Sequence, residues 1–251
     1  MKGTVYLVGA GPGASDLLTV RAARLLGEAD VVFHDALIAD EVLRLASRAK
    51  KIPVGKRCGR HSTAQHFINK RLADAARSHA VVVRLKGGDP MLFGRAHEEI
   101  AYLAARGVRV EVVPGVTAVL AASAELAISL TRRGAARSVA LVTPRVGHGE
   151  RESGWVASVL AADTAAIYMG AGEAEAIAAD LIAAGKPAQT PLALVEEASL
   201  PGMRVQHATL ADLPRLVTRG GPTLILLGEV YREALAAAAQ PARRRLASQR
   251  P

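Results

Sequence analysis

The chain has a single cysteine and few aromatic residues, and each scarcity excludes a class of protein. Cys58 is the only cysteine among 251 residues, so no disulfide can form within the chain and a zinc site built on thiolate pairs is excluded. Phe, Trp and Tyr together make up 3% of the residues. Single-stranded nucleic acids are bound largely through aromatic stacking, so we expect no nucleic-acid partner. Because the sequence offers no thiolate pair, we also expect no bound metal.

Long hydrophobic runs are also missing. The first apolar run ends at glycines after Val8, which is too short for a signal peptide or a membrane span. We therefore expect a cytoplasmic protein without a membrane association. Neither the GxSxG elbow of serine hydrolases nor the GxxxxGK[ST] phosphate loop occurs, so these two classes have no local support.

What the sequence does contain is a large apolar fraction and an excess of positive charge. Half of the residues are hydrophobic, which is enough to bury a substantial core. The formal net charge is +9. Such a balance can attract nucleic acid, a membrane surface or an anionic substrate, and it can equally be a solvated basic surface.

Short apolar runs alternate with segments of helical periodicity, a pattern typical of a mostly parallel α/β sheet. Strands are expected near 5–8, 30–35, 52–54, 81–85 and 108–113, and again near 138–142, 164–168, 192–195, 203–207 and 223–227. Ser15 or Asp16 is the expected N-cap of the first helix. A polar turn at 131–137 suggests a boundary between an N-terminal lobe, 1–132, and a C-terminal lobe, 133–251.

Three expected strands end in glycine loops, at 9–13, 87–88 and 115. Ligands of open α/β sheets bind beyond the carboxyl ends of the strands, so these loops indicate a small-molecule site. The first loop alone, Gly9-x-Gly11-x-x-Ala14, is compatible with a dinucleotide, another nucleotide-like ligand or a structural turn. Lys86-Gly87-Gly88-Asp89-Pro90 is more informative, because two glycines let a backbone approach a ligand closely.

Asp35 and Lys56 are the ionisable residues most suited to chemistry near this edge. Each follows a short apolar strand, and a carboxylate can accept a proton while an ammonium can donate one. A surface pair without function is the alternative. Met169, beside Gly170 at the end of a later strand, suits either a ligand contact or the core.

Taken together, the motifs resemble the tetrapyrrole methylases, most closely the uroporphyrinogen-III C-methyltransferases among them. The matching segments are VGAGPG (8–13), VVFHD (31–35), VGKR (54–57), GRHSTAQHFIN (59–69), VVRLKGGDP (82–90), FGR (93–95), VVPGVTA (112–118), YMG (168–170) and VEEAS (195–199). The segment from Val54 to Asn69 is the most specific part. The resemblance covers nearly the whole chain, from Val5 to about Val230.

The resemblance implies a two-lobed, class III (non-Rossmann) methyltransferase fold with a mostly parallel N-terminal sheet and a mixed C-terminal sheet. S-adenosyl-L-methionine would bind in the cleft between the lobes and leave as S-adenosyl-L-homocysteine. The implied reaction is C-methylation of uroporphyrinogen III at C2 and C7, giving precorrin-2 by way of precorrin-1 for sirohaem or cobalamin biosynthesis. A homodimer is also implied. The dehydrogenase–chelatase module of fused sirohaem synthases has no counterpart here, so methylation alone is expected.

The resemblance also implies site residues. Asp35 matches the proton acceptor and Lys56 the proton donor. Cofactor contacts are expected from Pro12, Gly87, Gly88, Asp89, Leu92, Thr117, Ala118, Met169 and Ala198. Eight substrate carboxylates would be met by basic side chains, for which Arg57, Arg60, Arg132 and Arg133 are the candidates.

This chain departs from the family pattern at several positions. Glu197-Ala198-Ser199 stands where Asn-Gly-Thr is common, and Arg132 stands where a histidine is common. Two rival functions remain open: another tetrapyrrole methylase acting on a later corrin precursor, and an NAD(P)-dependent oxidoreductase suggested by the first loop and Asp35. A non-catalytic binding module would leave the convergence of the glycine loops unexplained.

Overall fold

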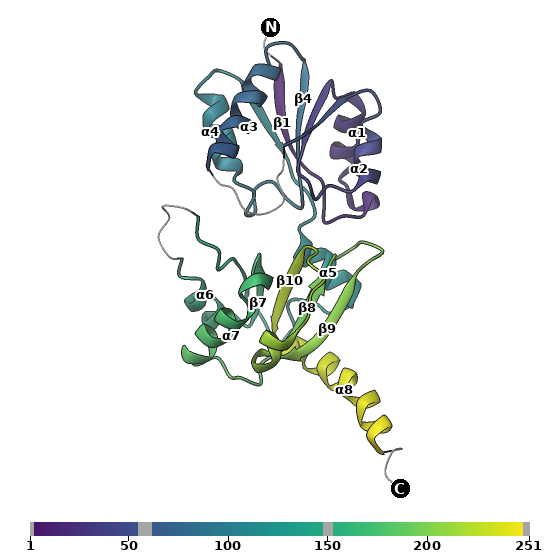
Figure 1. The fold of residues 1–251 in the computed structure, drawn as a ribbon, viewed down its shortest axis with the longest axis vertical. Helices are drawn as coiled ribbons and strands as arrows, with labels where there is room; N and C mark the ends of the chain where they lie inside the picture. The colour runs from purple at the N-terminus through teal and green to yellow at the C-terminus, as the bar shows by residue number, and fades with distance from the viewer. Residues whose placement is uncertain (1–2, 55–61, 148–152, 248–251) are drawn as a thin grey trace. The chain divides into compact units, whose positions relative to one another are not determined.

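The computed structural model describes residues 3–54, 62–147 and 153–247, with the chain traced in Figure 1. It divides into two compact units, Met1–Ala118 and Val119–Pro251, called here the N-terminal and the C-terminal unit. Lys56, Arg57 and Arg60 lie outside the described residues. Each unit is built on its own five-stranded sheet, so each is described separately.

The sheet of the N-terminal unit is entirely parallel. Its strands are β1 (Thr4–Gly9), β2 (Val31–His34), β3 (Lys50–Pro53), β4 (Val81–Lys86) and β5 (Arg109–Val113), in the order β3-β2-β4-β1-β5. Every strand pair in it runs in parallel. All five carboxyl ends therefore lie at one edge of the sheet, as the alternation of strands and helices predicts.

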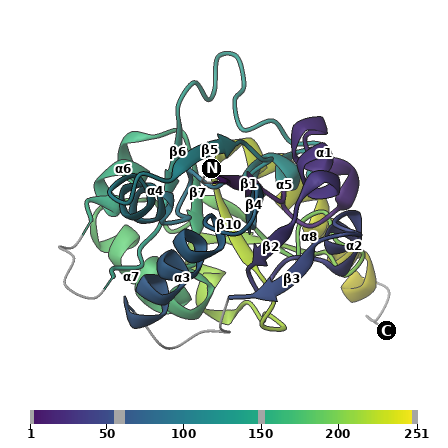
Figure 2. The ribbon, with the colours of Figure 1, turned by 90° about the horizontal axis from the view of Figure 1, so that it is seen from above.

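Helices cover both faces of this sheet, as Figures 1 and 2 show. The helices are α1 (Val20–Glu28), α2 (Asp40–Leu45), α3 (Ser62–Ala75) and α4 (Ala96–Ala104). Along β1 the side chains alternate: Val8 packs in the core under α1 and α2, whereas Val5 and Leu7 pack in the core under α3 and α4. This alternation turns one continuous apolar run into two cores.

The first helix begins later than the sequence pattern indicates. Ser15–Leu17 forms only a turn of 3-10 helix, and Leu18 is extended with φ −67° and ψ 143°. Thr19 caps α1 instead, because its Oγ1 accepts a hydrogen bond of 3.2 Å from the backbone N–H of Ala22. The expectation of an N-cap at Ser15 or Asp16 is therefore wrong.

The sheet of the C-terminal unit is mixed. Its strands are β6 (Val139–Val142), β7 (Thr164–Tyr168), β8 (Pro191–Glu196), β9 (Arg204–Thr209) and β10 (Thr223–Gly228), in the order β6-β7-β10-β8-β9. Strands β6 and β7 are parallel, whereas β10 runs antiparallel to both β7 and β8. The carboxyl ends of β7 and β8 thus lie at the same edge, beside the start of β10.

Helices complete this unit as well. They are α5 (Ala118–Leu126), α6 (Trp155–Ala161), α7 (Ala174–Ala183) and α8 (Arg232–Ala247), with short 3-10 turns at Ala171–Glu173, Leu210–Arg215 and Glu229–Tyr231. Val159 of α6 and Leu181 of α7 are buried in the core on one face of the sheet, and Val119 of α5 is buried in the core on the other. The combination of a parallel and a mixed sheet confirms the predicted fold class.

The two units divide earlier in the chain than the polar turn at 131–137 suggests. Val119 and Ala122 of α5 are buried together with Ala166, Val195 and Leu226 of the C-terminal sheet. Helix α5 therefore belongs to the C-terminal unit, although it directly follows the last loop of the N-terminal sheet.

His207 of β9 provides a test of this packing. Its Nδ1 is buried without a hydrogen-bond partner among the described residues, and burial lowers its pKa from 6.5. The unfolded chain therefore takes up the proton first as the pH falls, and the free energy of unfolding declines below about pH 6.5. We expect His207→Gln to reduce this acid loss in urea unfolding measured from about pH 7 to about pH 5. If the free energy of unfolding depended on pH equally in the parent and in His207→Gln, burial of His207 would not be the cause of the acid loss.

Candidate active site

The glycine loops of the N-terminal unit meet at the carboxyl edge of its sheet, as the sequence predicts. Gly11 and Gly88 are paired through two backbone hydrogen bonds, with N–O distances of 3.2 and 2.7 Å. A Cβ added to Gly9 would lie 2.6 Å from the Cα of Gly115. The loops after β1, β4 and β5 are therefore in direct main-chain contact.

The glycines of these loops have different roles. Gly9 and Gly115 leave no room for a side chain, because backbone atoms of the neighbouring loops occupy that space. At Gly87, by contrast, an added Cβ would have no described atom within 4 Å. Gly88 has a φ of +65°, a backbone conformation that favours glycine. A Cβ added to it would lie 3.9 Å from the Cα of Thr117, which is ordinary van der Waals contact. The open space beside Gly87 and Gly88 suits a ligand that presses against the main chain.

Asp89 links two of the loops through both of its carboxylate oxygens. Oδ1 accepts a hydrogen bond of 2.8 Å from the N–H of Met91, and Oδ2 accepts one of 2.9 Å from the N–H of Gly115. The first bond is the local turn that Asp favours, and the second joins the loop after β4 to the loop after β5. Leu92 lies in the same turn, where its N–H donates to the carbonyl of Asp89 at 3.3 Å.

Asp35, the candidate proton acceptor, follows β2 at the same edge and is held by a neighbour on β4. Its Oδ1 accepts a hydrogen bond of 2.6 Å from Nη2 of Arg84. The Asp35 side chain is 31% exposed, whereas that of Arg84 is 3% exposed. The carboxylate is thus accessible while its cationic partner is buried behind it.

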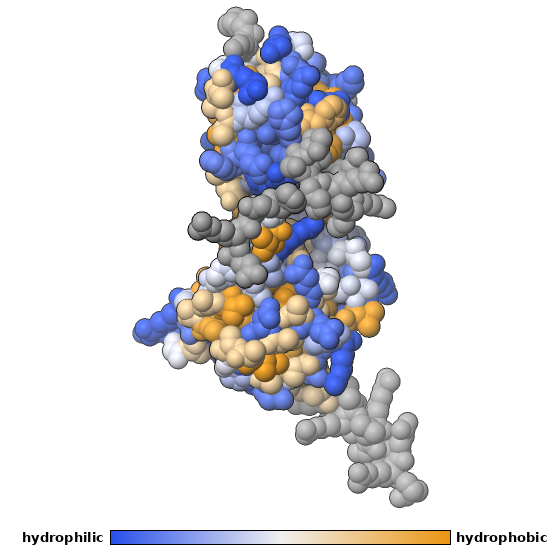
Figure 3. Space-filling view, turned by 60° about the vertical axis from the view of Figure 1, so that its left-hand side comes forward, coloured by the Kyte–Doolittle hydropathy of each residue, from blue (hydrophilic) through white to orange (hydrophobic). Residues whose placement is uncertain are grey.

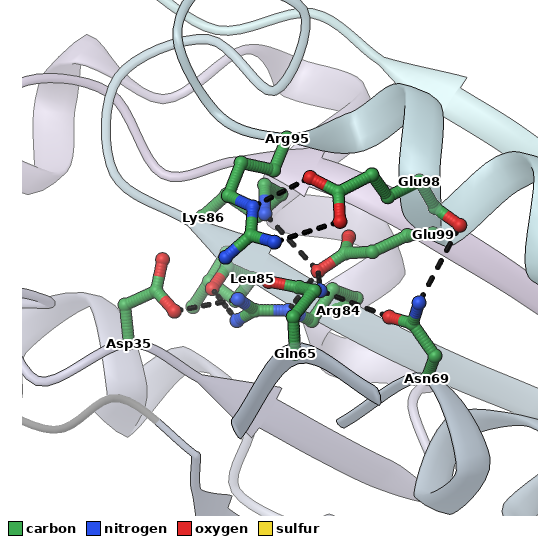
Figure 4. A network of polar contacts seen from close by, with 9 residues as sticks. All are labelled: Asp35, Gln65, Asn69, Arg84, Leu85, Lys86, Arg95, Glu98 and Glu99. Atoms are coloured by element: carbon green, nitrogen blue, oxygen red, sulfur yellow. Dashed lines mark hydrogen bonds and ion pairs between the residues drawn. The ribbon is translucent and has the colours of Figure 1, made fainter. Parts of the chain in front are cut away.

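Arg84 belongs to a buried polar network formed by Asp35, Gln65, Asn69, Arg84, Lys86 and Glu99, drawn in Figure 4. Its centre is Oε1 of Glu99, which accepts hydrogen bonds from Nε of Arg84 at 3.1 Å, Nζ of Lys86 at 3.2 Å and Nε2 of Gln65 at 3.0 Å. The network lies on the α3 and α4 side of the sheet, because Gln65 and Asn69 belong to α3 and Glu99 belongs to α4. Much of the coloured surface of the N-terminal unit in Figure 3 is hydrophilic.

The two cations of the network respond differently to burial. Burial alone would lower the pKa of Arg84, but the charges of Asp35 and Glu99 outweigh it, so that pKa is raised. Burial, together with the neighbouring Arg84 charge, lowers the pKa of Lys86 from 10.5 in spite of Glu99. Arg84 is therefore the permanent cation that Asp35 contacts.

A second group of strained loops lies at one edge of the C-terminal sheet. Met169, after β7, has φ +58° and is 44% exposed. Glu197 and Ser199, after β8, have φ +55° and +66°, and the buried Ala198 lies between them. Left-handed backbone at residues other than glycine costs free energy and concentrates at functional sites. Met169 and Ala198 thus lie in strained loops at one edge of this sheet, and their role as cofactor contacts stays a prediction.

The arginines proposed for the substrate are only partly described. Arg132 makes an exposed ion pair of 2.8 Å with Glu233 of α8, and Arg133 is exposed. An exposed pair contributes little to stability, and a role of Arg132 and Arg133 in binding the substrate stays a prediction. Roles for Lys56, Arg57 and Arg60 remain predictions, because these residues fall outside the described ranges.

The described residues contain neither a metal-binding cluster nor a helix suited to a membrane. Among them, no group of three or more His, Cys, Asp or Glu side chains is arranged to hold a metal ion. Nor does any described helix combine the length and the apolar character needed to cross a membrane.

Sequence reasoning missed the network apart from Asp35. The available signal was the pair Arg84 and Lys86, two cations at alternate positions of an otherwise apolar strand. Alternate positions share one face of a sheet, so the pattern indicates charge turned toward one covering layer of helices. Glu99 has no comparable signal, since polar residues are common on helices. Gln65 and Asn69 belong to the segment from Val54 to Asn69 that is most specific to the resemblance, but nothing in it indicates a contact with Glu99.

Substitutions at two glycines should separate structural contact from open space. Gly115→Ala would drive a Cβ into the backbone of Gly9 and Gly88, and we expect the free energy of unfolding to fall by about 1–3 kcal/mol. Gly87→Ala is the matched control, with an expected change within about 0.5 kcal/mol. Urea unfolding of both variants measures the difference, and equal effects would contradict the close contact of the loops.

Comparisons with known proteins agree with the resemblance. A sequence model of the family described as "Tetrapyrrole (Corrin/Porphyrin) Methylases" matches residues 4–214. A siroheme synthase from Pseudomonas fluorescens (strain Pf0-1) is 47% identical over 240 residues, which are 93% of this chain and 52% of that protein. The chain thus spans about half the length of the curated relatives it matches.

Solved structures match over a larger share of their length. A native uroporphyrin-III C-methyltransferase from Thermus thermophilus is 41% identical, with a TM-score of 0.81, over 92% of this chain and 94% of that one. A structure of this enzyme from the same organism, complexed with S-adenosyl homocysteine, is 43% identical with the same TM-score over 92% and 99%.

Proposed function

The chain belongs to the tetrapyrrole (corrin/porphyrin) methylases, and we propose that it methylates uroporphyrinogen III at C2 and C7, giving precorrin-2 by way of precorrin-1. The observation that carries this proposal is the similarity to a uroporphyrin-III C-methyltransferase that was solved with S-adenosyl homocysteine. The similarity extends over almost the full length of that enzyme. The siroheme synthases among the relatives support a role of the product in sirohaem formation, with cobalamin as the other destination.

The residues present fit S-adenosyl-L-methionine as the methyl donor. The space beside Gly87 and Gly88 leaves backbone groups accessible, and Pro12 and Thr117 belong to the loops that meet there. In the C-terminal unit, the left-handed Met169 and the turn around Ala198 provide further candidate contacts. We propose that Pro12, Gly87, Gly88, Asp89, Leu92, Thr117, Ala118, Met169 and Ala198 contribute to holding it.

When bound, S-adenosyl-L-methionine supplies an activated methyl group to a nucleophilic pyrrole carbon, and S-adenosyl-L-homocysteine is released. The macrocycle is left with a positive charge until a proton departs. Asp35 is suited to accept that proton, because it is an accessible carboxylate at the edge where the glycine loops meet. Lys56 is the proposed proton donor, and much of the remaining catalysis would come from alignment of the reacting atoms.

The substrate's carboxylates require cations, and the positive balance of the chain supplies them. We propose Arg57, Arg60, Arg132 and Arg133 for these contacts, since guanidinium groups bind carboxylates in a bidentate manner. A homodimer in the cytoplasm, without a nucleic-acid or membrane partner, completes the proposal and rests on the family resemblance and the composition.

Transfer of label from the methyl donor tests the reaction. We expect two labelled methyl groups per macrocycle when the protein is incubated with methyl-labelled S-adenosyl-L-methionine and uroporphyrinogen III, as measured by mass spectrometry. Calorimetric titration with S-adenosyl-L-homocysteine is the parallel measurement. Binding without incorporation would refute uroporphyrinogen III as substrate and point to a later corrin precursor. Binding of a nicotinamide cofactor instead would favour the oxidoreductase.

Asp35→Asn tests the proton acceptor. The amide is similar in size and can still accept the hydrogen bond from Arg84, but it cannot take up a proton. We expect turnover to fall by about 10²- to 10⁴-fold, with unchanged affinity for S-adenosyl-L-homocysteine. Asp40→Asn, in the exposed first turn of α2, is the control. Turnover at the parent rate in Asp35→Asn would mean that Asp35 has no acid–base role.

A further inference from the structure

The network places charged side chains in the interior of the N-terminal unit, where apolar side chains would avoid the cost of burying charge. Arg84, Lys86 and Glu99 are each at most 5% exposed in their side chains, and removing such charges from water is unfavourable. Val83 and Leu85, which alternate with them along β4, are apolar and lie in the core on the other face of the sheet. Apolar residues of similar size at positions 84 and 86 would pack as well, so the charges call for another explanation.

That explanation lies at the exposed end of the network. Arg84 donates from Nε to Glu99, from Nη1 to the carbonyl of Leu85 at 3.1 Å, and from Nη2 to Asp35. The first two bonds fix the plane of the guanidinium from inside the protein. Its remaining bond then sets the position of one oxygen of Asp35, and Figure 4 shows the carboxylate at the end of the network opposite Asn69.

We propose that Glu99 is a positioning residue for the proton acceptor: it holds Arg84, and Arg84 clamps Oδ1 of Asp35 so that the other oxygen faces the substrate. The inference rests on the proposed function, in which Asp35 accepts the proton released after methyl transfer. The Glu99 side chain is 0% exposed, so the role we propose for it acts through Arg84. Its negative charge matters because Arg84 and Lys86 both converge on the same Oε1.

Glu99→Gln isolates this charge with little change of shape. Oε1 keeps its acceptor role toward three donors, and the new NH₂ group replaces Oε2, which is buried without a partner among the described residues. The neighbouring Glu98→Gln is the matched control, since the Glu98 carboxylate forms an exposed ion pair of 2.6 Å with Arg95. Glu98 meets Asn69 only through its backbone carbonyl, at 3.4 Å, and the substitution leaves that carbonyl in place. Urea unfolding and S-adenosyl-L-homocysteine titration check that both variants fold.

The kinetic test uses the coupling between Glu99 and Asp35. We expect Glu99→Gln to lower kcat by about 10- to 100-fold with little change in KM, because a misplaced base loses alignment. In the Asp35→Asn background the same substitution should cause less than about a 2-fold further loss, since the group being positioned has gone. Equal losses in both backgrounds, or no loss in the parent, would overturn the proposal.

A second readout does not depend on activity. With ¹³C-labelled aspartate, the carboxyl resonance of Asp35 is assigned by its disappearance in Asp35→Asn. We expect that resonance to shift in Glu99→Gln and in Gln65→Met, which removes one donor to Glu99 at similar volume, but not in Glu98→Gln. An unshifted resonance in both network variants refutes the positioning role. If the parent shows no methyl transfer, the proposed function fails, and the resonance still decides whether Glu99 orients Asp35.

Discussion

Gly9 and Gly115 approach each other so closely that neither can carry a side chain, and the arrangement of the N-terminal sheet edge depends on this contact. It brings the loops after β1, β4 and β5 together, and the pairing of Gly11 with Gly88 and the carboxylate of Asp89 then fix them. The result is a main-chain surface with open space beside Gly87. Neither a close neighbour nor a left-handed backbone conformation requires a glycine at this position. A ligand that needs backbone contact is what such a surface can recognise.

Behind this edge lies a network of buried charges, whose removal from water lowers the stability of the fold. Two cations and two carboxylates share one network, in which Glu99 alone accepts three hydrogen bonds at a single oxygen. Networks of this kind are costly unless they are satisfied, and they hold their members in defined positions when they are. Of the two carboxylates in the network, Asp35 is the one that is partly exposed, and the positioning role proposed for Glu99 rests on this difference.

The C-terminal unit has strained backbone at the ends of two of its strands. Met169, Glu197 and Ser199 adopt left-handed backbone after β7 and β8, two strands whose carboxyl ends lie beside the start of β10. Glu196, buried at the end of β8, accepts hydrogen bonds from the N–H groups of Arg219 and Gly221, which pins the loop before β10 to the same edge. Both units therefore concentrate unusual backbone or charge at one edge of a sheet, as expected for functional loops on a rigid scaffold.

Local sequence was sufficient for the strands and for the glycine loops, but not for the start of α1. Short, mostly apolar runs such as those at Val81–Lys86 and Thr164–Tyr168 predict strands without further information. The glycines of Gly87-Gly88-Asp89 mark the end of the first of them. Tertiary structure alone decided which residues meet: that Glu99 of α4 lies under Arg84 of β4, that Asp89 reaches Gly115, and that α5 packs with the C-terminal sheet. Periodicity reports which face of an element is buried, but a hydrogen bond between residues far apart in the chain exists only after packing has set their distance and direction.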